Sequence, residues 1–175
     1  MSEQASAEQQ MMEKPSPEHH WLHKLVGRWA FESECVMGPD QPPMKTTGAE
    51  TVRSLGGLWT IGEGTMGAGE QSGSSVMTLG YDPRGKHFVG TFVASCMTHL
   101  WPYRGTLDAA GKVLTLDSEG PSFAGDGTMA KYQDIIEFID DDHRVLRSRF
   151  LLPDGTWQSF MTAHYRRVLD GSQRT

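Results

Sequence analysis

Residues 74–96, SSVMTLGYDPRGKHFVGTFVASC, decide the fold, because they hold two β-strand patterns separated by a turn signal. Small, β-branched and aromatic residues fill 74–81 and 86–96, and Asp82-Pro83-Arg84-Gly85 stands between them. Proline pre-sets one torsion of such a turn and glycine relieves another. The segment therefore predicts a β-hairpin.

The same pattern continues in both directions along the chain. Further strands are predicted at 27–37, 47–55 and 58–66 before this hairpin, and at 99–108, 112–119, 128–139, 144–152 and 156–167 after it. Strands joined in sequence avoid exposed edges only by closing into a barrel or folding into a sandwich. We favour the barrel, so the predicted fold is all-β: an antiparallel up-and-down barrel of about ten strands.

One short helix is predicted before the strands. Ser16 and Pro17 suit an N-cap and first turn, and Gly27 suits a C-cap. The apolar side chains between them share one helical face: Trp21, Leu22, Leu25 and Val26. Residues 1–15 are mostly Glu, Gln, Ser and Ala and predict a disordered tail, and 170–175 predict a loose C-terminal tail. Residues 16–169 are then a single barrel domain.

Composition excludes some functions and favours others. The formal net charge of -6 argues against a nucleic-acid surface, which needs clustered Lys and Arg. No stretch reaches the roughly 18 apolar residues that span a bilayer, and residues 1–10 are polar, unlike a signal peptide. We therefore expect a cytoplasmic protein without membrane or nucleic-acid partners. Cys35 and Cys96 are expected to be reduced.

Short motifs along most of the chain resemble a known family. LVGRW at 25–29 looks like the start of a lipocalin-type barrel, where a helix leads into a Gly-x-Trp strand. Other motifs are GAET at 48–51, LGGLW at 55–59, TLGYDP at 78–83, FVGT at 88–91 and YRR at 165–167. Together they resemble the bacterial domain-of-unknown-function family 1579, from about residue 21 to 167. This resemblance implies a lipocalin-like (calycin) barrel and no established activity, and such barrels often associate as homodimers.

Strand alternation predicts which side chains point into the barrel, because neighbours of the same parity share a face. Aromatic and polar residues then meet on the inward faces, as in many small-molecule pockets. The predicted ligand-binding residues are Trp29, Trp59, Glu63, His99, Trp101, Tyr103, Tyr132, Asp134 and Ser148. We expect a small, partly apolar ligand. Alternatively, these polar groups pair with one another and simply fill a small barrel.

Catalysis and cofactor binding remain as other hypotheses, although a protein without catalysis or cofactor is favoured. His99 beside Asp134 or Glu63 could transfer protons, provided that the side chains lie within hydrogen-bond reach. An inward His164 would resemble the haem-binding histidine of nitrobindin-like barrels. Inward Tyr165 and Arg167 would resemble the carboxylate anchor of fatty-acid-binding barrels. A structural or interaction domain is a further alternative, in which an exposed apolar patch matters most.

Several apparent motifs lack the context that their chemistry needs. GEGTMG at 62–67 matches a dinucleotide fingerprint but lies in a strand with no helix after it. His19 and His23 have zinc-ligand spacing but no third ligand, and 140–142 lack the glycine and glutamate of a calcium loop. No metal site is therefore predicted. The chain has no Gly-x-Ser-x-Gly elbow either, which disfavours acyl transfer.

Overall fold

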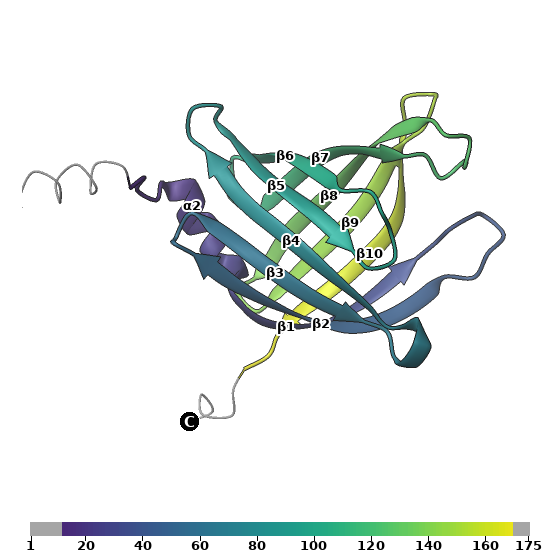
Figure 1. Cartoon of the computed structure of the whole chain (residues 1–175), viewed down its shortest axis with the longest axis horizontal. Coiled ribbons are helices and arrows are strands. Elements are labelled where there is room, and N and C mark those ends of the chain that lie inside the picture. Colours follow the sequence, from purple (N-terminus) through teal and green to yellow (C-terminus); the bar gives the residue numbers. More distant parts are fainter. Residues whose placement is uncertain (1–11, 170–175) are drawn as a thin grey trace, which may run out of the picture.

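A computed structural model describes residues 12–169, which form a closed barrel of ten antiparallel strands (Figure 1). The strands are β1 (Gly27–Cys35), β2 (Met44–Leu55), β3 (Trp59–Met66), β4 (Gly73–Asp82), β5 (His87–Ala94), β6 (Trp101–Leu107), β7 (Val113–Pro121), β8 (Met129–Asp140), β9 (His143–Leu151) and β10 (Trp157–Arg167). Each strand pairs with the next along the chain, and β1 also pairs with β10. The predicted all-β barrel is confirmed. The predicted tails lie outside the described residues, except for residues 12–15.

The hairpin at 74–96 forms as predicted, with Asp82 opposite His87 at its last pair. Its glycine acts differently from the expectation, however. The left-handed torsion lies at Lys86, with φ of 53°, and not at Gly85. A Cβ at Gly85 would lie 2.4 Å from the His87 ring. This position therefore needs glycine for space rather than for a strained torsion.

The predicted helix is shorter than its sequence pattern suggests. It comprises α2 (Pro17–Leu22) and the 3₁₀ turn η1 (His23–Leu25), and a second 3₁₀ turn, η2 (Gly69–Gln71), joins β3 to β4. Val26 is already extended, so Gly27 is the first residue of β1 rather than a helix C-cap. Trp21 packs edge-on against Phe88 and Phe138. The helix thereby covers one end of the barrel, opposite the β1–β2 loop (Figure 1).

Burial changes from one end of the barrel to the other. We call the end beside α2 the helix end, and the end with the β1–β2, β3–β4 and β7–β8 loops the open end. Inward side chains near the helix end are buried: Trp29, Phe31, Val52, Leu79, Phe88, Leu114, Leu116, Ile136, Phe138 and Leu146. Towards the open end most inward side chains are partly exposed: Ser33, Cys35, Thr46, Met66, Ser75, Met77, Phe92, Ala94, Trp101, Ala130, Phe150 and Met161. The core therefore fills the helix end most completely.

Candidate functional site

Three of the predicted inward residues meet in a hydrogen-bonded group in the middle of the barrel. Tyr103 comes from β6, Asp134 from β8 and Ser148 from β9, where it stands directly opposite Asp134. The Tyr103 hydroxyl donates to Oδ2 of Asp134, and the Ser148 hydroxyl donates to Oδ1. Both carboxylate oxygens of Asp134 are therefore satisfied by protein groups.

Burial controls the acidity of this group. It raises the pKa of Asp134 above its ordinary value, although the hydrogen bonds from Ser148 and Tyr103 act in the opposite direction. The pKa of Tyr103 is also raised well above its ordinary value, first by burial and then by the nearby Asp134. The interior thus disfavours negative charge on both side chains.

A second polar group, which was not predicted from the sequence, lies nearer the helix end. Arg144 of β9 forms an ion pair with Glu50 of β2, and their side chains are 4% and 13% exposed. The guanidinium carbon of Arg144 lies 3.9 Å from the ring centroid of Tyr165 and 4.7 Å from that of Trp29. Alternation within β9 could have predicted that Arg144 points inward, because it has the same parity as the inward Ser148.

The Arg144 side chain has one donor left over. Its Nε is buried and has no hydrogen-bond acceptor within residues 12–169. The Arg144 side chain also lines a cavity of about 20 Å³, together with Glu50, Thr60 and apolar neighbours that include Met77, Leu79 and Ile136. That volume holds about one water molecule or one small polar group.

Aromatic rings gather towards the open end of the barrel. Two of the predicted wall residues are among them: Trp101 packs edge-on against Tyr132, with 4.9 Å between their ring centroids. Phe123, in the β7–β8 loop, packs against Tyr132, Phe150 and Phe160. Gly120 leaves the room for Trp101, since a Cβ there would lie 2.2 Å from its ring. Aromatic rings thus line much of the interior next to the open end.

Exposed apolar side chains surround this end of the barrel. They lie in the loops and strand ends that form its rim: Val36, Met37, Met44, Met97, Leu100, Phe123 and Met129. Phe123 is 52% exposed and Met44 is 59% exposed. Methionine adapts its shape to varied apolar partners, so such a rim suits the passage of an apolar molecule.

Two predicted site residues point away from the interior. Trp59 and Glu63 lie on the outer face of β3, and Trp59 is 40% exposed. The prediction took the large residues of this strand as the inward ones, but the structure turns the small Thr60, Gly62 and Gly64 inward. Trp59 instead covers Gly80 from outside, where a Cβ would lie 2.4 Å from its ring. Their expected place inside the barrel is therefore wrong.

The proposed acid–base pair does not form. His99 lies just before β6, where its Nε2 is 3.0 Å from the carbonyl oxygen of Glu119 and its ring packs against Trp101. Asp134 is bonded to Tyr103 and Ser148, and Glu63 faces outward. Proton transfer between His99 and either carboxylate lacks the contact that it requires.

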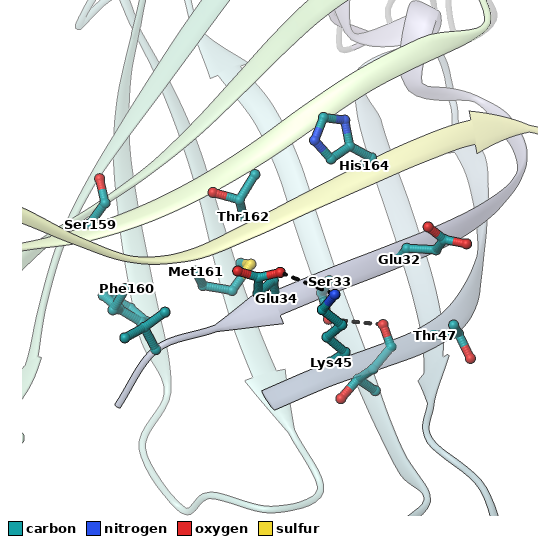
Figure 2. Close-up of a pocket in the computed structure, with 12 residues that line it drawn as sticks. Glu32, Ser33, Glu34, Lys45, Thr47, Ser159, Phe160, Met161, Thr162 and His164 are labelled. Carbon is teal, nitrogen blue, oxygen red and sulfur yellow. Dashed lines mark hydrogen bonds and ion pairs between the residues drawn. The ribbon is translucent and has the colours of Figure 1, made fainter. Parts of the chain in front are cut away.

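The histidine suggested for haem also faces outward. Figure 2 shows His164 on the outer wall formed by β2, β1 and β10, over a groove of about 770 Å³. Its Nδ1 lies 3.1 Å from Nε2 of His143. Burial, and then Arg166 and His164, lower the pKa of His143. His164 therefore cannot ligate a group held inside the barrel.

The last strand turns its other face inward. Tyr165 is buried against Phe31 and Arg144, and burial raises its pKa. The guanidinium carbon of Arg167 lies 4.2 Å from the ring centroid of Trp29. Its nitrogen atoms donate hydrogen bonds to the carbonyl oxygens of Lys24, Val26 and Asp141. Because these carbonyl groups occupy its donors, Arg167 fixes the helix end and is not a ligand anchor.

Two wider features of the described chain bear on its chemistry. Within residues 12–169, no three His, Cys, Asp or Glu side chains group as a metal site, and Cys35 and Cys96 are both free. Burial raises the pKa of the Cys35 thiol. None of the helices in that part of the chain is long and apolar enough to cross a membrane.

Comparison with one solved structure, the first of the two below, supports the fold. The crystal structure of Rv2717c from M. tuberculosis aligns over 89% of this chain and all of that chain, with 15% identity and a TM-score of 0.62. A redesigned β-barrel aligns over 83% of this chain and 93% of that chain, with 12% identity and a TM-score of 0.37. No curated protein matches the sequence.

The family comparison covers nearly the whole described barrel. A family model described as protein of unknown function, DUF1579, matches residues 14–167. This range begins just before α2 and ends with the last residue of β10. The chain therefore belongs to the DUF1579 family.

Proposed function

We propose that the protein binds a small, partly apolar ligand inside the barrel, with access from the open end. One observation carries this proposal: most inward side chains of the open half, the part of the barrel next to the open end, keep accessible surface, whereas most of those near the helix end are buried. The helix covers the other end, so only the open half presents its inward side chains to solvent. A ligand that enters from this end would meet these side chains first.

The inward side chains suit a ligand with both apolar and polar parts. Met77, Phe92 and Met161 offer apolar contact, and the ring group of Trp101 and Tyr132 lines the route from the rim. Farther in lie the Tyr103, Asp134 and Ser148 group and the Glu50–Arg144 pair. Pockets for small molecules usually combine a mainly apolar wall with a few polar groups that fix orientation.

Filling the open half tests this proposal. Ser75 points inward on β4 and is partly exposed, while the adjacent Ser74 points outward. N-phenyl-1-naphthylamine, a neutral dye that brightens in apolar surroundings, would report occupancy by its fluorescence. We expect saturable binding to the wild type and an affinity lower by about tenfold or more in Ser75→Trp, because the indole occupies the dye's space.

Ser74→Trp is the matched control, since it adds the same ring to the outer face of the same strand. Its affinity for the dye should stay within about twofold of the wild type. Absence of saturable binding to the wild type would overturn the proposal. Equal losses in the two variants would also overturn it, because the dye would then not distinguish the inside of the barrel from the outside.

A further inference from the structure

The charged groups inside the barrel already have protein partners. Among residues 12–169, the charged side chains on inward strand positions are Glu50, Asp134, Arg144 and Arg167. Glu50 and Arg144 neutralise each other across the inner face of β1 and β10. Arg167 is bonded to backbone carbonyl groups and to Asp142 at the helix end. Both carboxylate oxygens of Asp134 accept hydrogen bonds, from Tyr103 and Ser148.

An added charge would disturb these interactions. An anionic ligand at the Arg144 guanidinium would either replace Glu50, which would leave a carboxylate buried without a cation, or bring a second negative charge beside Glu50 at the free Nε. A cationic ligand would similarly compete with Arg144 for Glu50. Breaking a buried ion pair is strongly unfavourable because the remaining partner keeps its desolvation cost. A neutral ligand avoids both penalties.

The interior still lacks hydrogen-bond partners for two buried groups. Nε of Arg144 has no acceptor, and Oγ of Ser118, on the inner face of β7, has no partner within the part of the chain that the structure describes. Buried polar atoms of this kind are usually satisfied. The cavity of about 20 Å³ beside Arg144 admits one small oxygen-bearing group and not a bulky head.

We infer that the ligand of this barrel is an electrically neutral amphiphile whose inner end presents an oxygen acceptor, such as a hydroxyl or carbonyl, to Nε of Arg144. Its apolar body then lies among the aromatic and methionine side chains of the open half. This inference rests on the proposed function and specifies its ligand class. A water molecule in the 20 Å³ cavity is the competing occupant for the same donor.

Three compounds with one chain and different heads test the inference: decanol, decanoate and decylammonium. Each competes with N-phenyl-1-naphthylamine for wild-type protein at pH 7.5. We expect decanol to displace the dye at a concentration about tenfold lower than either ion, which corresponds to about 1.4 kcal/mol. Decanoate or decylammonium binding as tightly as decanol would overturn the inference, while the dye's own binding would still support a ligand site.

A charge substitution separates head-group chemistry from the general hydrophobicity of the three compounds. Glu50→Gln keeps the side-chain shape but leaves Arg144 without its counterion, so decanoate should gain at least about fivefold relative to decanol. Glu63→Gln removes the same charge from the outer face of the neighbouring strand and should keep the wild-type ratio. An unchanged ratio in folded Glu50→Gln would contradict the assignment to Arg144.

If Glu50→Gln does not fold, the competition of the three compounds for the wild-type protein still tests the inference, because that experiment needs no substitution. Circular dichroism of both variants establishes which case applies. If all three compounds fail while the dye binds, water alone satisfies Arg144 and the inference is wrong. If the dye also fails to bind, the proposed function itself falls.

Discussion

Among single residues, the tryptophans show how position in the barrel decides the role of a side chain. Trp29 is fully buried, donates from Nε1 to the carbonyl oxygen of Leu25 at 2.8 Å and packs against two guanidinium groups. Trp59 is 40% exposed on the outer face. The same residue type thus supports the core at one position and covers the sheet at the other.

Replacing each tryptophan by alanine should separate these roles. We expect Trp29→Ala to lower the free energy of unfolding by about 3–5 kcal/mol, because it leaves a large cavity and removes the stacking surface of Arg144 and Arg167. Trp59→Ala should cost about 1 kcal/mol or less, since its ring already contacts solvent. Urea denaturation measures both values, and equal losses would contradict the assigned faces.

The failure of the prediction at Trp59 has a physical origin. Parity correctly grouped Trp59 with Glu63, but it could not say which of the two faces was inside. The alternate residues, Thr60, Gly62 and Gly64, are small, and at the two glycines neighbouring strands fill the space: a Cβ at Gly62 would lie 3.0 Å from Oε1 of Glu50, and one at Gly64 would lie 2.7 Å from Oγ of Ser75. An inward run of small residues therefore looks like an outward one when each strand is considered alone.

At the level of the elements, β10 has neither face cleanly apolar, so its sequence left the orientation open. Pairing with β1 and β9 determines the orientation: Ala163 and Tyr165 are buried, while His164 and Arg166 are exposed. Two adjacent arginines consequently have different roles. Arg167 joins β10 to Lys24 of η1 and to Val26, which links η1 to β1, whereas Arg166 lies on the outer surface.

Conservative substitution of the two arginines tests this difference. Arg167→Lys should lower the free energy of unfolding by about 1–3 kcal/mol, because an ammonium group cannot reproduce the planar set of hydrogen bonds and the stacking on Trp29. Arg166→Lys keeps the charge at an exposed position and should change it by less than about 0.5 kcal/mol. Thermal or urea unfolding supplies the comparison. The reverse order of effects would show that β10 turns its other face inward.

Considered as a whole, the molecule divides into a packed helix end and a more accessible open half, although every strand runs through both. The ten strands and their sequential pairing were predictable because turn residues recur at regular intervals. The Glu50–Arg144 pair was not, since its members are 94 residues apart and meet across the inner face of two other strands. Alternation predicts faces, but only closure of the barrel determines which inward groups meet.

Hydrogen exchange should reveal the same division. We expect backbone amides near Ile136 and Leu114 to exchange most slowly, and those near Ala130 and Ala94 in strands of the same sheet to exchange faster, because fewer buried contacts oppose local opening there. Mass spectrometry of deuterated peptides from each half measures this contrast. Uniform protection along β8 would show that the two halves open together.

The pairing of β1 with β10 has a consequence for how the protein reaches its native state. Strands β2 to β9 can add to one another in order as the chain is synthesised, but β1 gains its second neighbour only when the last strand is available. Until then β1 and β9 present unpaired backbone groups on which another chain can add a strand. Intermolecular association therefore competes with this last pairing, and dilute conditions during refolding favour closure of the barrel.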